Sequence, residues 1–154
     1  MVKFNKVEAE KDFPTVEKLG IGKHLTQVSK VVDTKKVEGN PVDLVDKNGI
    51  PFWLVIFKDK EEKEHAETFF FGGSMAWKTK RFLVAIGEMA EDEDLETCGK
   101  DFTPTDVIGA YLSIEIEEDL KATKEEYKYR ICKNGFEAYG TKAEPKKEVA
   151  AAPF

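Results

Sequence analysis

The stretch from Ile50 to Phe71 restricts the possible folds of this chain more than any other. It contains an apolar, β-branched and aromatic run (IPFWLVIFK), a charged turn (DKEEKEHAE) and a second aromatic run (TFFF). Residues of these types favour strands. The sequence therefore predicts strands over 50–58 and about 63–71, paired as an antiparallel hairpin around the charged turn.

This hairpin carries six aromatic rings, on Phe52, Trp53, Phe57, Phe69, Phe70 and Phe71. Successive side chains of a strand point to opposite faces of a sheet, so the six rings cannot share one face. Six rings also exceed what the interior of one small domain encloses. We therefore expect some of them in the core and others on the surface, where they form a platform for flat ligands.

The bulk composition is typical of one globular domain. The chain has 154 residues, of which 41% are hydrophobic and 35% charged, enough for a single core. No run approaches the roughly 20 apolar residues of a membrane span. The first residues, MVKFNKVEAEKDF, contain no apolar signal segment. These features predict a cytoplasmic protein without a membrane partner.

Charge and cysteine content give weaker indications. Cys98 and Cys132 lack CxxC spacing, so we expect two unpaired thiols in a reducing compartment. The net charge of −6 argues weakly against a nucleic-acid partner. Segregation of the charges over the surface can outweigh this total.

The rest of the chain is predicted from breakers and periodicity. A β-branched strand covers 23–33 and a loop covers 35–41. Residues 42–45 either extend that strand or form a short strand of their own, before an Asn48-Gly49 turn. A helix covers 75–86, with Ser74 as its N-cap and Gly87 as its C-terminal cap. An acidic loop covers 88–101. Alternation predicts two more strands, over 109–118 and 126–132.

This order, three strands, a helix and two strands, is that of a mainly β protein with one helix. It matches a five-stranded Greek-key barrel of the oligonucleotide-binding (OB) type, whose helix lies between strands three and four. Other small α+β domains share the same order. We expect an N-terminal arm over 1–20, an OB-fold-like domain over 21–140 and a disordered tail over 141–154.

Aromatic residues interleaved with lysine and arginine are the candidate site. Bases stack on aromatic rings while cations neutralise phosphates, which is how single strands are bound without sequence preference. The alternative is that these rings fill the barrel and the cations are solvated. The candidate DNA-binding residues are Lys23, His24, Lys30, Trp53, Phe57, Lys58, Phe69, Trp77, Lys78, Lys80, Tyr127, Lys128, Tyr129 and Arg130.

No catalytic or metal-binding motif stands out. His24 and His65 have no partner at a metal-ligand spacing, and the acidic loop lacks the glycine and terminal glutamate of a calcium loop. Hydrolase, phosphate-binding and dinucleotide motifs are missing as well. We therefore expect no enzyme activity and no cofactor, although a small enzyme with an unrecognised site stays open.

The terminal residues Pro153 and Phe154 form a second candidate site. A partner protein could bind the ring in an apolar pocket and the carboxylate through a basic residue. The alternative is that this ending has no function.

Several blocks together resemble a known family. GKHLTQVSKVV, NGIPFWLVIF, WKTKRFLVAIG, DVIGAYLSIEIEED and a tyrosine-rich last strand resemble bacteriophage single-stranded DNA-binding proteins of the OB fold. The resemblance covers about Gly20 to Tyr139. It implies a role in phage DNA replication or recombination in the host cytoplasm.

The chain ending also resembles a known motif, the Pro-Phe tip of bacterial single-stranded DNA-binding proteins, which recruits replication and repair proteins. Here the acidic run that precedes that tip is missing, and Lys146 and Lys147 lie upstream.

The sequence therefore predicts a non-enzymatic, sequence-independent binder of single-stranded DNA. The alternative is a protein-interaction module on the same barrel, with the rings as interface anchors. Whether the chain forms a homodimer is left open.

Overall fold

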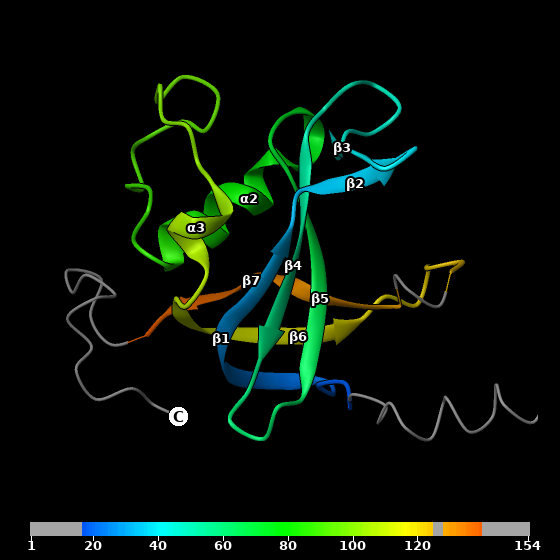
Figure 1. Cartoon of the computed structure of the whole chain (residues 1–154). Helices are drawn as coiled ribbons and strands as arrows, with labels where there is room; N and C mark the ends of the chain where they lie inside the picture. Colours follow the sequence, from blue (N-terminus) through cyan, green and yellow to red (C-terminus); the bar gives the residue numbers. More distant parts are fainter. Residues whose placement is uncertain (1–16, 125–127, 140–154) are drawn as a thin grey trace, which may run out of the picture.

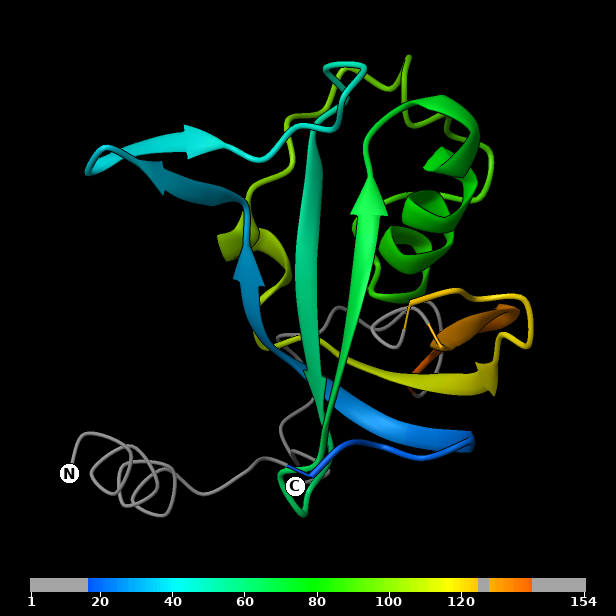
Figure 2. The same cartoon turned by 90° about the vertical axis from the view of Figure 1, so that its right-hand side faces the viewer.

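The computed structural model describes residues 17–124 and 128–139. Its main element is an antiparallel five-stranded sheet with the order β5-β4-β1-β6-β7. The sheet curls into a half-barrel, with β1, β4 and β5 on one side and β6 and β7 crossing them (Figures 1 and 2). Its strands are β1 (Gly22–Val32), β4 (Phe52–Lys58), β5 (Glu64–Phe70), β6 (Tyr111–Glu118) and β7 (Tyr129–Ala138).

Strand β1 belongs to both halves of this sheet. Its residues 22–27 pair with β6 and its residues 27–32 pair with β4. The register shifts between Val28 and Lys30, so Ser29 forms a bulge. A bulge bends a strand and increases its twist, which turns the β4–β5 hairpin across the β6–β7 pair.

A small second sheet replaces the loop predicted over 35–41. Strands β2 (Thr34–Val37) and β3 (Asn40–Asp43) form a hairpin that projects from the half-barrel (Figure 2). Glu38 and Gly39 have φ values of 52° and 84°, as a two-residue type I′ turn requires. The prediction was wrong because Gly39 makes a hairpin turn, and because Pro41 is tolerated in a two-stranded ribbon.

The helices lie between β5 and β6 along the chain. A 3₁₀ turn, η1 (Gly73–Met75), leads into α2 (Ala76–Ala85), and α3 (Pro104–Val107) follows the acidic loop. Ser74 lies inside the 3₁₀ turn, so the N-cap position falls on Met75 and the predicted serine cap is wrong.

Gly87 ends α2 as predicted. Its φ is 83°, its N–H donates to the Val84 carbonyl oxygen, and the Glu88 N–H donates to that of Leu83. This is the Schellman arrangement.

The core lies between the inner face of the half-barrel and α2. Trp53, Val55 and Phe57 of β4 and Phe69 of β5 are buried there, together with Phe82 of α2. The Phe82 ring centroid lies 4.6 Å from that of Phe69 and 5.6 Å from that of Phe57. Burial of this aromatic cluster fixes the hairpin against the helix.

Three predicted base-stacking residues are therefore core residues. Trp53 is 6% exposed, and Phe57 and Phe69 are fully buried. The prediction that they face solvent is wrong, because both alternating sets of β4 side chains are apolar. Alternation alone therefore could not indicate which set faces inward.

The last strand is longer than the predicted 126–132 and has one close approach. A Cβ on Gly135 would lie 2.9 Å from the Glu115 carbonyl oxygen, so only glycine fits there without a shift. The candidate Tyr127 lies outside the described residues.

The described part of the predicted arm packs on the domain. Leu19 is 4% exposed and belongs to the core, and Lys18 forms a parallel bridge with Glu64. The domain thus begins before the predicted boundary at residue 21. Residues 1–16 and the predicted disordered tail, with Pro153 and Phe154, lie outside the described residues.

Within residues 17–124 and 128–139, no helix has the length and apolar character needed to cross a membrane.

The burial of Trp53 predicts a large effect of its truncation on stability. We expect Trp53→Ala to lower the free energy of unfolding by about 3–5 kcal/mol, because a buried ring leaves a cavity. Trp77, which is 38% exposed on α2, provides the matched control. Urea unfolding should show the midpoint of Trp77→Ala close to that of the wild type. Equal midpoints for the two variants would contradict the placement of Trp53.

Candidate functional site

The second face of the β4–β5 hairpin, here called the outer face, is also apolar. Residues directly opposite each other in an antiparallel pair share a face. The outer pairs are Phe52 with Phe70, Leu54 with Thr68, Ile56 with Ala66 and, at the turn end, the charged pair Lys58 with Glu64. The Phe52 and Phe70 rings are half-buried, with centroids 5.4 Å apart and planes inclined by 44°. The hairpin thus has one set of rings in the core and another pair at the surface.

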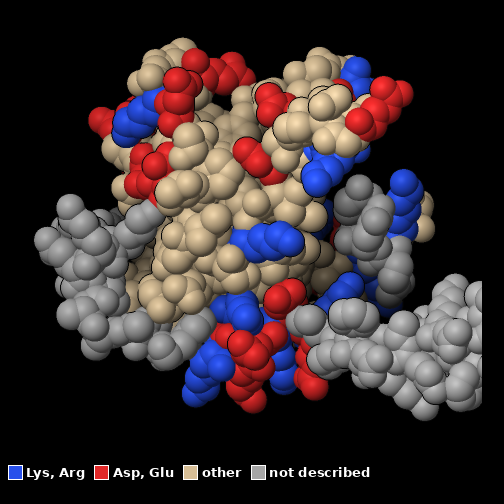
Figure 3. Space-filling model, viewed as in Figure 1, with Lys and Arg blue, Asp and Glu red and all other residues tan. Residues whose placement is uncertain are grey.

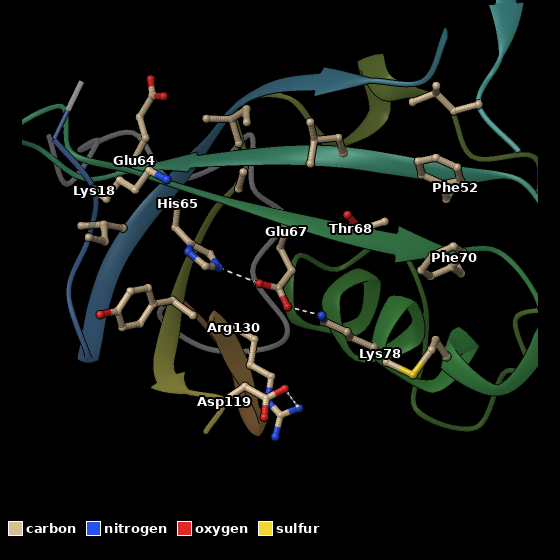
Figure 4. A pocket seen from close by; sticks show the side chains of 17 residues that line it. Lys18, Phe52, Glu64, His65, Glu67, Thr68, Phe70, Lys78, Asp119 and Arg130 are labelled. Carbon is tan, nitrogen blue, oxygen red and sulfur yellow. Dashed lines mark hydrogen bonds and ion pairs between the residues drawn. The ribbon is translucent and has the colours of Figure 1, made fainter. Parts of the chain in front are cut away.

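A groove of about 680 Å³ lies along this face and around the edge of β5 (Figure 4). Its volume is within the usual range for ligand pockets, about 300–1,000 Å³. The outer face, α2 and β7 all contribute to its lining. Among the lining residues are Leu54, Phe70, Met75, Lys78, Tyr129 and Arg130.

Two lysines next to the outer face have no counterion among the described residues. Lys18 lines the groove, and Lys30 of β1 lies opposite Ile56 on the same face. Neither forms an ion pair with a described residue. Lys58 lies 3.1 Å from the exposed carboxylate of Glu62, a pair that water and salt weaken. Cationic groups therefore lie next to the apolar surface.

A buried carboxylate lies at the edge of β5. Glu67 is 4% exposed and points inward, in contrast to the rest of the charged residues of this hairpin. Its Oε1 lies 2.6 Å from Nε2 of His65, and its Oε2 pairs with Lys78 of α2 (Figure 4). The Ile131 backbone N–H of β7 donates to both of its oxygens, at 3.2 and 3.3 Å. Glu67 therefore links β5 to α2 and to β7.

Arg130 at the far wall of the groove is also neutralised. Its Nε donates to Glu117 at 2.8 Å and its Nη1 to Asp119 at 3.2 Å. This arginine lowers the pKa of the Glu117 carboxyl group below its usual value.

Burial, reinforced by Glu117, raises the pKa of the nearby Cys132 thiol to about 11. Cys132 is therefore a protonated, weakly reactive thiol near neutral pH.

The structure brings only some of the predicted DNA-binding residues together. Three of them, Lys78, Tyr129 and Arg130, line the groove. Lys30 and Lys58 lie on the outer face, as the β1–β4 register places them. Lys128 lies beside Tyr129, with its Nζ 5.6 Å from the ring centroid.

Four others lie away from the groove. Lys23, on the β6-paired half of β1, is bound to Glu137 at 2.9 Å, and this carboxylate raises the Lys23 pKa. The His24 Nε2 lies 2.8 Å from the Gly20 carbonyl oxygen. Trp77 and Lys80 are on α2 and do not line the groove.

Sequence reasoning missed the outer-face residues Phe52, Leu54, Thr68 and Phe70, and the groove residue Lys18. The sequence did contain a signal for a ring pair: counting residues outward from the charged turn places Phe52 opposite Phe70. The same count places Trp53 opposite Phe69, so it could not show which of the two pairs lies at the surface.

No model of a known protein family matches the chain, and no curated protein matches it. The function is therefore argued from the geometry of the site.

Among residues 17–124 and 128–139, no group of three or more His, Cys, Asp or Glu side chains could hold a metal ion.

The Glu67 links predict a strong effect of its removal. We expect Glu67→Ala to lower the free energy of unfolding by about 3–5 kcal/mol, because the buried Lys78 ammonium and the Ile131 N–H lose their acceptor. Urea unfolding measures this change. The matched control is Glu137→Ala, which breaks only the exposed pair with Lys23 and should leave the midpoint unchanged. A Glu67→Ala midpoint equal to that of the control would contradict the proposed role.

Proposed function

We propose that the outer face of β4 and β5 binds single-stranded DNA without sequence preference. The observation that carries this proposal is the half-buried Phe52–Phe70 ring pair, flanked by Lys18 and Lys30, which form no ion pair with a described residue. Rings of this kind offer flat apolar surface to any base, which is why stacking tolerates every sequence. Lysines without a counterion are available for phosphates.

The topology supports the proposal further. We propose that the half-barrel is an OB fold, since three strands of the five-stranded sheet precede α2, two follow it, and β1 is shared by the two halves. In that fold the face of the second and third strands binds oligonucleotides. These would be β4 and β5, the strands that carry the ring pair. The resemblance to phage single-stranded DNA-binding proteins supports a role in phage DNA replication or recombination in the host cytoplasm.

The negative net charge of the chain is compatible with DNA binding at the outer face, because the acidic loop lies elsewhere. The acidic loop over 88–101 lies on the α2–α3 side of the molecule, away from the outer face (Figure 1). Figure 3 shows acidic and basic side chains gathered above and below a largely uncharged area, with a basic side chain in the middle of it. A single strand bound to the outer face would lie away from the acidic loop.

Fluorescence anisotropy with a labelled oligo-dT tests this function. We expect Phe70→Ala to weaken binding by about 1–3 kcal/mol, the usual contribution of one stacked base. Trp77→Ala, which removes an exposed ring from α2, is the matched control and should leave the affinity unchanged. Lys30→Ala should reduce the slope of log K against log [salt] by about 0.7, because one phosphate contact is lost.

Two results would contradict the proposal. One is the absence of oligo-dT binding at low salt, which would favour the alternative of a protein-interaction module with the same rings as anchors. The other is an equal loss of affinity in Phe70→Ala and Trp77→Ala, which would move the binding surface away from the outer face.

A further inference from the structure

The edge of β5 next to the outer face carries a second set of binding groups, the backbone N–H and C=O groups that point away from β4. β5 is the last strand of the five-stranded sheet and pairs in that sheet with β4 alone. In an antiparallel pair, every second residue directs its N–H and C=O away from the partner strand.

Three contacts show which residues of β5 direct their backbone groups away from β4. The Glu64 N–H donates to the Glu17 carbonyl oxygen and the Glu64 carbonyl accepts from the Leu19 N–H, both at 2.9 Å. At the other end, the Phe70 carbonyl accepts from Thr79 Oγ1 of α2. Since Glu64 and Phe70 direct these groups away from β4, the residues between them in the same alternation, Ala66 and Thr68, do so too.

The outward backbone groups of Ala66 and Thr68 are unsatisfied within the described residues. None of the hydrogen bonds outside the regular strand pairing involves their N–H or C=O groups. Both residues line the groove, and Ala66 is exposed. Two donors and two acceptors thus face the groove in the spacing of a strand.

A short segment of this chain already uses the same edge. Residues Glu17 to Leu19 lie against Glu64 as a parallel strand, through the two backbone hydrogen bonds given above. From Gly22 the chain forms β1 instead, so this segment does not continue along β5. The edge therefore accepts a strand at Glu64 and stays open at the next two outward positions.

The charges beside the edge favour an uncharged occupant. Lys78 is paired with the buried Glu67, and Arg130 with Glu117 and Asp119. Releasing Lys78 for an outside anion would leave the carboxylate of Glu67 buried and unpaired, at a cost of several kcal/mol. The two cations of α2 and β7 at this edge are thus neutralised, whereas Lys30 on the outer face forms no ion pair with a described residue; Lys18, whose backbone bridges Glu64 at the start of the edge, forms none either.

We propose that the β5 edge binds an extended, uncharged peptide segment of a partner protein by strand addition. The peptide backbone pairs with Ala66 and Thr68, and alternate apolar side chains of the peptide lie against Phe70 and Met75. A DNA backbone carries no N–H donors at this spacing and is not favoured here. The groove of about 680 Å³ accommodates a few extended residues.

Selection of a random heptapeptide display library on the full chain, followed by synthesis of the enriched peptides, tests this inference. We expect Thr68→Pro to weaken their binding at least about tenfold, because it removes one edge N–H and leaves a peptide carbonyl unpaired. Thr68→Val keeps the N–H and is the matched control. Its affinity should stay within about twofold of the wild type. Circular dichroism and urea unfolding check that Thr68→Pro is folded.

A second measurement leaves the protein unchanged. Single N-methylation along an enriched peptide should abolish binding at every second position only, because alternate peptide N–H groups face β5. The proposal is overturned if no peptide is enriched, or if N-methylation has no period of two. It is also overturned if Thr68→Pro and Thr68→Val bind equally. A dimer in sedimentation that Thr68→Pro dissociates would overturn it too, by making a second copy the occupant.

Discussion

The buried carboxylate of Glu67 holds the two ends of the curled sheet together. β5 and β7 are the first and last strands of the sheet, and no β-ladder joins them among the described residues. The bulge at Ser29 turns the two halves across each other, and Glu67 spans the gap by accepting hydrogen bonds from β7 and pairing with Lys78 of α2. Because the groove runs along the same gap, its width and the position of its walls depend on this one side chain.

The sequence predicted the architecture well and the orientation of the hairpin poorly. The strand pair around the charged turn, the helix after it and the glycine at the end of that helix follow from local rules of propensity and capping. The inward set of β4 does not, since Trp53, Val55 and Phe57 alternate with the equally apolar Phe52, Leu54 and Ile56. The facing set is chosen by packing against Phe82, a contact between distant segments. Glu67 makes the inward face of β5 hard to predict as well, because a charged residue usually indicates the face that points to solvent.

The site was predicted in part for a similar reason. Lysine and arginine positions can be read from the sequence, but their counterions depend on register and tertiary contact. Arg130 lies opposite Glu117 only because β6 and β7 pair in that register, and Lys78 meets Glu67 only because α2 packs on β5. After these pairs form, the groove has two different sides. One has rings and unpaired lysines, which suit stacked bases and phosphates. The other has free backbone groups and neutralised charges, which suit a peptide strand.

β4 and β5 use their inner face for the core, and we propose that they use their outer face to bind ligand. Mapping of ¹⁵N-labelled amide chemical shifts during an oligo-dT titration tests it most directly. The account predicts perturbations concentrated in 52–58 and 66–70 and around Lys18 and Lys30, with the acidic loop over 88–101 unaffected. Perturbations centred on α2 or on the β6–β7 strands, with the outer face silent, would contradict it.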